Sequence, residues 1–181
     1  KINNSYELGQ SNAPTDGGDM LKTRGDGTLV WEGVADTTYE PKWYGGRGVF
    51  GGGSTSSVTR SNIVEYITIS STGNSTDFGD LTVGRSDPSA CSDGSRGIFG
   101  GGYSVAGGYE DTIDYITIAT TGNAQDFGNL SVARKSTNCV SDGSRGVFRG
   151  GRDSGANLNT MDYITIGTLG NAIDFGDTTV S

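Results

Sequence analysis

One phrase occurs three times along the chain: Arg-Gly-(Val/Ile)-Phe, a Gly-Gly pair, an acidic residue before Tyr-Ile-Thr-Ile, a Gly-Asn turn, and Asp-Phe-Gly. Its arginines fall at Arg47, Arg96 and Arg145, so the period is 49 residues both times. A fixed period of this length is typical of repeat architectures, in which each unit buries its apolar face only against its neighbours. The sequence therefore predicts three repeats, at about 37–85, 86–134 and 135–181.

The composition indicates that these repeats are built from strands. Glycine accounts for 32 of the 181 residues, and it costs about 1 kcal/mol relative to alanine at each helix-interior position. The runs between the glycines are rich in Tyr, Ile, Val, Thr and Phe, which suit a pleated and half-buried surface. We therefore expect an all-β chain.

The middle repeat predicts four short antiparallel strands in sequence order. The first is Asp87–Ser92, and it is followed by Asp-Gly, a strong hairpin-turn signal. Arg96–Phe99 and the β-branched run Ile113–Ile118 give the second and third strands. A Thr-Gly-Asn turn then leads into a fourth strand, Ala124–Val132. Four such strands in about 49 residues are typical of a propeller blade.

The repeats resemble the kelch family in three features. An apolar strand ends in a Gly pair, a later strand has an acid-preceded Tyr, and the fourth strand carries an aromatic residue, here Phe where kelch proteins usually have Trp. The resemblance implies kelch-like β-propeller blades and a structural role for these positions. They are Gly52, Gly53, Tyr66, Phe78, Gly101, Gly102, Tyr115, Phe127, Gly150, Gly151, Tyr163 and Phe175.

Three blades do not close a propeller, which typically has four to eight. Residues 37–46 can supply the first strand of the first repeat, and residues 27–34 are in register with the fourth strand of a repeat. Open ends of a repeat array expose apolar surface unless they are capped. We therefore expect that the natural chain continues, or that copies associate into a homo-oligomer.

The N-terminal part, residues 1–33, predicts a separate β-hairpin and linker before a repeat domain at 34–181. Met20–Thr23 and Thr28–Trp31 flank a Gly-Asp-Gly turn. Residues 12–34 are similar to a short element of bacteriophage tail-fibre and other virion proteins: a Pro/Gly-rich lead, Met-Leu, a polar turn and Leu-x-Trp. That resemblance implies a virion location, other virion proteins as partners, and a trimer as the favoured oligomer.

Charge and missing residue types narrow the functional classes. A net charge of −8 with no basic stripe disfavours nucleic acid, and no apolar run is long enough for membrane insertion. The absence of histidine removes His-based catalysis and His-ligated metal sites. We therefore predict no catalytic residues, no metal and no cofactor. Cys91 and Cys139 are interpreted as small apolar residues that face different ways and form no disulfide.

The repeats diverge only between the Gly pair and the Tyr, at 54–64, 103–113 and 152–161. Loops on a rigid scaffold often carry function. Within them, the aromatic, arginine and amide residues typical of recognition surfaces are Arg60, Tyr103, Tyr109, Arg152 and Asn157. The alternative is that these loops are merely unconstrained.

Three functions remain open from the sequence. The first is a non-enzymatic virion protein (a tail fibre, tail or head appendage) that serves assembly and recognises a host-surface glycan or protein. The second is a cytoplasmic kelch-type module for protein–protein interaction. The third and weakest is a carbohydrate-active enzyme with a propeller core, since no catalytic pair of carboxylates or tyrosines is singled out.

Overall fold

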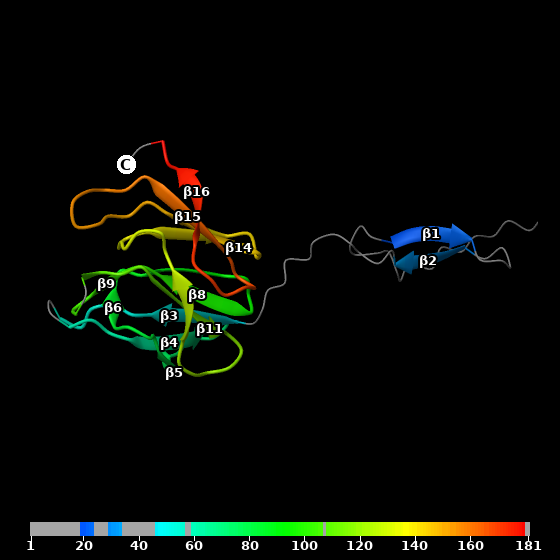
Figure 1. The fold of residues 1–181 in the computed structure, drawn as a ribbon. Helices are drawn as coiled ribbons and strands as arrows, with labels where there is room; N and C mark the ends of the chain where they lie inside the picture. Colours follow the sequence, from blue (N-terminus) through cyan, green and yellow to red (C-terminus); the bar gives the residue numbers. More distant parts are fainter. Residues whose placement is uncertain (1–18, 24–28, 34–45, 57–58, 107, 180–181) are drawn as a thin grey trace, which may run out of the picture. The chain divides into compact units, whose positions relative to one another are not determined.

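A computed structural model of the chain describes residues 19–23, 29–33, 46–56, 59–106 and 108–179, with side chains from residue 46 onward (Figure 1). The described residues form strands, turns and loops, and none of them lies in a helix that could cross a membrane. The chain divides into two compact units, residues 1–41 and 42–181.

The first unit contains the hairpin that the sequence predicts. Strand β1 (Asp19–Thr23) pairs antiparallel with β2 (Leu29–Gly33), and Leu21 is opposite Trp31. The predicted turn between them lies outside the described residues. The interpretation of residues 27–34 as a fourth repeat strand is wrong, because β2 belongs to a two-stranded sheet with β1.

The second unit contains three larger antiparallel sheets, one for each repeat, which follow one another in chain order (Figure 1). The second and third sheets have the predicted four strands in sequence order. The first sheet shows three strands. Its predicted first strand, within residues 37–46, falls on residues 37–45, which lie outside the described part of the chain. The strands are β3 (Arg47–Gly51), β4 (Ile63–Thr68) and β5 (Thr76–Asp80); β7 (Ser89–Ser92), β8 (Arg96–Gly100), β11 (Thr112–Thr117) and β12 (Gln125–Asn129); and β13 (Asn138–Ser141), β14 (Arg145–Arg149), β15 (Thr160–Thr165) and β16 (Ile173–Asp177).

The turns between the first two strands of the second and third repeats are fixed by aspartate. The Asp93 carboxylate accepts hydrogen bonds from the backbone N–H groups of Ser95 and Arg96, at 2.7 and 2.6 Å. Asp142 does the same 49 residues later. An Asx turn of this kind places the second strand beside the first and explains why Asp-Gly recurs there.

The apolar core lies between the repeats. Val64, Phe78 and Leu81 of the first repeat pack with Phe99, Ile116 and Ala124 of the second. The equivalent residues of the second repeat pack in the same way against the third, around Phe127, Leu130, Phe148 and Ile164. Each sheet therefore completes its core only against the next one, as expected for a repeat protein.

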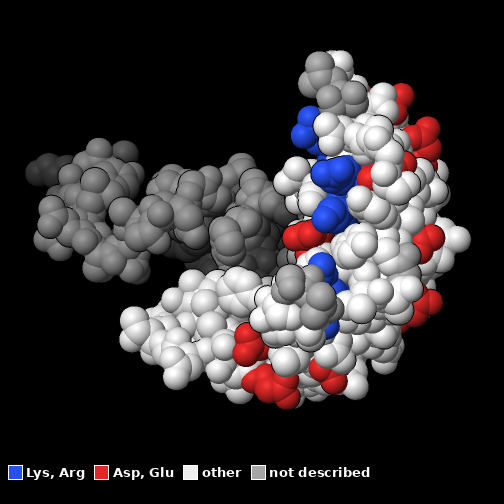
Figure 2. All heavy atoms as spheres, turned by 90° about the vertical axis from the view of Figure 1, so that its left-hand side faces the viewer, with Lys and Arg blue, Asp and Glu red and all other residues white. Residues whose placement is uncertain are grey.

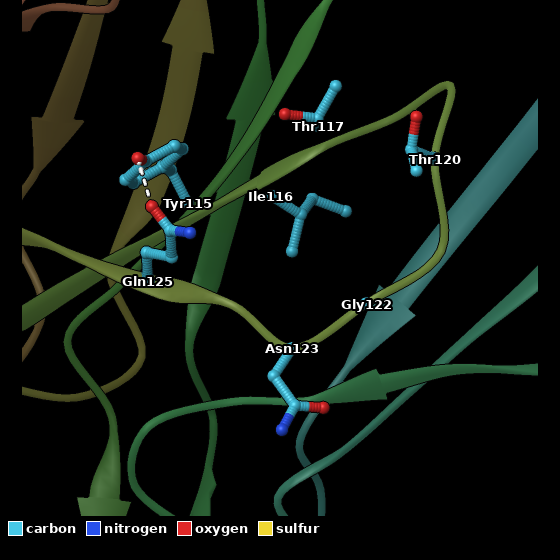
Figure 3. A pocket seen from close by; sticks show the side chains of 7 residues that line it. All are labelled: Tyr115, Ile116, Thr117, Thr120, Gly122, Asn123 and Gln125. Atoms are coloured by element: carbon cyan, nitrogen blue, oxygen red, sulfur yellow. Dashed lines mark hydrogen bonds between the residues drawn. The ribbon is translucent and has the colours of Figure 1, made fainter.

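A turn contact joins the second and the third repeat to the outer strand of the repeat before it. The N–H groups of Gly122 and Ala124 donate to the carbonyls of Phe78 and Asp80, at 2.7 and 2.8 Å. The Asn123 side chain points away from Tyr115 and Gln125 toward that strand (Figure 3), where it accepts from the Asp80 N–H at 3.1 Å. The same three bonds recur between residues 170–172 and 127–129.

This turn contact explains Asp-Phe-Gly. At Gly79 and Gly128, a Cβ atom would strike the carbonyl of the incoming turn, that of Gly122 or Gly170. Only glycine permits such a close backbone approach. The motif is thus the docking edge for the next repeat.

A buried ion pair also crosses each junction. Arg85 pairs with Asp114 at 3.0 Å, and Arg134 pairs with Asp162 at 2.9 Å, with all four side chains fully buried. Each aspartate also accepts from the hydroxyl and N–H of one residue of the preceding repeat, Thr82 or Ser131. Buried charges are tolerated only when they are paired and hydrogen-bonded in this way.

The repeated arginines at 47, 96 and 145 lie over the repeated tyrosines. Arg47, Arg96 and Arg145 stand 4.7, 5.1 and 4.8 Å from the ring centres of the tyrosines of their own repeats. The first two also donate to a carbonyl of the next repeat, Ile118 or Ile166. The repeated aromatic and arginine side chains therefore serve the scaffold.

Candidate functional site

The loops of the second repeat contain strands that the sequence did not predict. Strand β6 (Arg85–Ser86) pairs with β9 (Tyr103–Ser104), which pairs with β10 (Gly108–Tyr109), in a small three-stranded sheet. This sheet lies at the end of the second unit where the divergent loops lie (Figure 1). The segment interpreted as a loop is short and polar, and its two-residue strands lack the alternation that marks a strand in sequence.

Two tyrosines form the centre of this sheet. Tyr103 and Tyr109 are direct partners across β9 and β10. Their rings meet edge to face, with centres 5.3 Å apart and planes at 87°. Both residues are partly exposed, so they offer aromatic surface to a ligand while they hold each other in place.

Cations from the two neighbouring repeats converge on Tyr103. The Arg60 guanidinium, from the first repeat, is 5.7 Å from the Tyr103 ring centre. The Lys135 ammonium, from the start of the third repeat, is 5.0 Å from Tyr103 and 6.0 Å from Tyr109. Cations within about 6 Å of a ring centre are attracted by its quadrupole. Asp87 is also close, 3.8 Å from the Lys135 ammonium.

Arg152 and Asn157 continue the same edge into the third repeat. Arg152 exchanges backbone hydrogen bonds with Lys135, at 3.0 and 3.1 Å. The backbone of Arg152 also forms an isolated antiparallel β-bridge with Asn157. Both residues line a hollow of about 250 Å³ together with Ser136, Arg149, Gly150, Gly151 and Leu158. Beside it, N–H groups of Gly155 and Ala156 hydrogen-bond to the Asp153 carboxylate and lower its pKa.

Some of the positive charges of this acidic chain lie at that end of the repeat unit. Figure 2 shows Lys and Arg side chains following one another across the end where the loops lie. We define the loop cluster as Arg60, Tyr103, Tyr109, Lys135, Arg152 and Asn157. Exposed positive side chains can attract an anionic ligand even when the net charge is −8.

The structure brings the five sequence candidates onto one edge. Tyr103 contacts both Arg60 and Tyr109. Arg152 and Asn157 are joined to them through Lys135. Sequence reasoning missed Lys135, which sits in a segment treated as scaffold. The repeat register contains the signal, since Lys135 replaces Ser86 of the preceding repeat.

Other groups of polar side chains are less suited to bind a ligand or a substrate. Asp114 and Asp162 are fully buried and bound to arginine, which leaves no carboxylate of these pairs open to a substrate. The described residues include no group of three or more metal-ligating side chains. A hollow of about 180 Å³ beside Tyr115 recurs in the third repeat, but the Tyr115 hydroxyl is already bonded to Gln125 (Figure 3).

The two cysteine side chains face a different way from the one that the sequence predicts. Cys91 and Cys139 pack against the same core between the second and third repeats instead of facing different ways. A hydrogen bond to Cys91 and burial both raise the pKa of the Cys139 thiol well above its ordinary range. Both cysteines are free thiols in this structure.

Comparison with known proteins adds no assignment. No protein-family model matches the chain, and no curated protein matches it either.

Proposed function

We propose that the chain is a non-enzymatic virion protein whose kelch-like blades present the loop cluster to a glycan on the host surface. The observation that carries the proposal is the convergence of Arg60, Tyr103 and Lys135 from three consecutive repeats. Side chains that meet from separate repeats form a surface that no single repeat could offer. Such surfaces on rigid repeats are suited to binding.

The chemistry of the cluster favours an acidic glycan. The tyrosine rings offer flat apolar surface for the C–H face of a sugar ring. Arg60 and Lys135 supply positive charge for carboxylate groups, and Arg152 lies further along the same edge. Asn157 adds an amide able to bond hydroxyl groups.

The structural use of the repeated residues supports a non-enzymatic role. The arginines, tyrosines and Asp-Phe-Gly segments contact one another within and between repeats. The virion assignment is supported by the resemblance of residues 12–34 to tail-fibre elements. An antibody against residues 42–181 that labels purified virus particles would support that part, and labelling of host cytoplasm alone would favour the cellular kelch-type module.

Binding to an array of acidic and neutral glycans tests the site. We expect signals on acidic glycans only, which fall with added salt because exposed charges are screened. Y103A and K135Q should each weaken binding about tenfold, since each removes one half of a cation–aromatic contact.

Matched variants separate the site from general damage. Y103F keeps the ring and K135R keeps the charge, so both should retain most of the binding. Equal losses in Y103A and Y103F, or no acidic preference in the parent protein, would contradict the proposed site.

A further inference from the structure

The two ends of the repeat array carry the complementary halves of its internal junctions. In the second and third repeats, Phe99 and Phe148 pack against the preceding repeat and are 3% and 0% exposed. Their counterpart in the first repeat, Phe50, is 58% exposed. An exposed ring at a position that is otherwise core indicates a missing neighbour.

The third repeat shows the opposite half. Phe78 and Phe127 are covered by the following repeat and are 2% and 3% exposed, whereas Phe175 is 51% exposed. Gly176 keeps the positive φ of Gly79 and Gly128, yet nothing lies within 4 Å of its Cβ position. The outer edge of β16 is thus built to receive a turn that no described residue provides.

We infer that a second copy of this chain docks head to tail on these faces and closes a six-bladed ring. The leading face is Phe50, Ile69 and the turn at residues 73–75; the trailing face is Arg145, Phe175, Gly176 and Asp177. Two copies bring six repeat sheets, which lies within the four to eight blades typical of propellers, whereas three copies would bring nine. This proposal differs from the trimer that the fibre resemblance implies.

The backbone hydrogen bonds between neighbouring repeats predict the hydrogen bonds between the two copies. Gly122 donates to Phe78 and Gly170 donates to Phe127, so the Gly73 N–H should donate to the Phe175 carbonyl of the second copy. Residues 75 and 74 should likewise bond the backbone of Asp177.

Arginine supplies a further bond of the same kind. Arg47 donates to Ile118 at 2.9 Å and Arg96 donates to Ile166 at 2.8 Å. By the same register, Arg145 should donate to the Ile69 carbonyl of the second copy.

Three positions make this junction more polar than the internal ones. Arg149 occupies the position at which the other repeats have the glycine over which Phe99 and Phe148 pack. Thr178 occupies the position of a core leucine of the other repeats, and Ser75 occupies that of a core alanine. The pairing should therefore be reversible and dependent on concentration. A head-to-tail contact forms a ring only when its rotation closes and otherwise grows into a filament.

Sedimentation equilibrium on the 181-residue chain tests the inference. The mass should rise with concentration from 18.7 kDa to a limit of twice that value. F50E blocks the leading face and F175E blocks the trailing face, so each variant alone should stay monomeric. Their equimolar mixture should dimerise again, because each supplies the face that the other lacks.

Controls keep the test decisive. V105E alters another exposed apolar residue and should dimerise like the parent. R149G restores the glycine opposite Phe50 and should tighten the dimer, a gain that misfolding cannot produce. A parent that stays monomeric up to about 1 mM, the weak end of specific association, would overturn the inference. A mass that grows without limit, or dimers of F50E alone, would overturn it as well.

Discussion

The middle repeat and the two outer repeats contain the same side chains in different surroundings. Phe99 and Phe127 of the middle repeat are almost fully buried, whereas Phe50 and Phe175 at the ends are more than half exposed. The strands that carry them pair in the same register. The difference shows that these two phenylalanine positions of the repeated phrase serve the junctions between repeats.

The acidic residue before each tyrosine also differs in burial from one repeat to another. Asp114 and Asp162 are buried against an arginine from the preceding repeat. Glu65 occupies the equivalent position of the first repeat, where it is exposed and accepts a hydrogen bond from Ser75. The longer side chain thus occurs where no described arginine faces it.

Removing a buried carboxylate should have the largest effect. D162A leaves the Arg134 guanidinium buried without its partner, and breaking such a pair costs about 3–5 kcal/mol of unfolding free energy. E65A, at the equivalent exposed position, should cost less than about 0.5 kcal/mol. Urea unfolding followed by circular dichroism measures both, and similar losses would show that the junction is not what makes the difference.

Truncating the repeated phenylalanine should have the next largest effect. F127A opens a cavity between the second and third repeats and should cost about 3–5 kcal/mol. F175A removes a ring that is already half in solvent, so about 1 kcal/mol is expected. The same unfolding experiment, made at a concentration where the chain is monomeric, checks the pair. A loss in F175A as large as that in F127A would contradict the comparison.

Replacing glycine by alanine at two equivalent positions measures how much the turn contact contributes to stability. Gly128 and Gly176 both have positive φ, at 145° and 125°, so alanine is strained at either. Only at Gly128 does the new Cβ meet a carbonyl of the next repeat. G128A should therefore be less stable than G176A by about 1–3 kcal/mol in monomeric protein. Equal stabilities would mean that the turn contact contributes nothing.

The smallest expected effect concerns the thiols at the second junction. The raised pKa keeps the Cys139 thiol protonated at neutral pH, and the thiolate is the reactive form. Iodoacetamide should therefore modify Cys139 far more slowly than a free cysteine, and faster as the pH becomes strongly alkaline. C91A removes the hydrogen bond that raises the pKa most, so it should speed the reaction. Neutral-pH modification at the rate of free cysteine would contradict this environment.

The local part of the fold could be predicted from sequence. The 49-residue period, the Asp-Gly turns and the β-branched runs around Tyr115 gave the sheets and their strand order. These signals depend on neighbours along the chain, which a sequence displays directly. Strand ends differed by a few residues, as for the fourth strand of the middle repeat, predicted at 124–132 and observed at 125–129.

The partners across a junction could not be predicted in this way. Nothing local to Asp162 shows that Arg134 will face it, or that the turn at 170–172 will bond the strand that carries Phe127. The loop cluster was found only in part for the same reason. Lys135 has no aromatic neighbour in sequence, and its contact with Tyr103 depends on how the third repeat packs on the second.

Amide hydrogen exchange tests the central claim most directly: the turn of each repeat is held by the strand of the one before. It is best measured in the F50E/F175E double variant, which keeps both end faces open. The N–H groups of Gly122, Ala124, Gly170 and Ala172 should exchange as slowly as strand amides, because each donates across a junction. The equivalent N–H groups of Gly73 and Ser75 should exchange rapidly. Equal rates in all three turns would contradict the account.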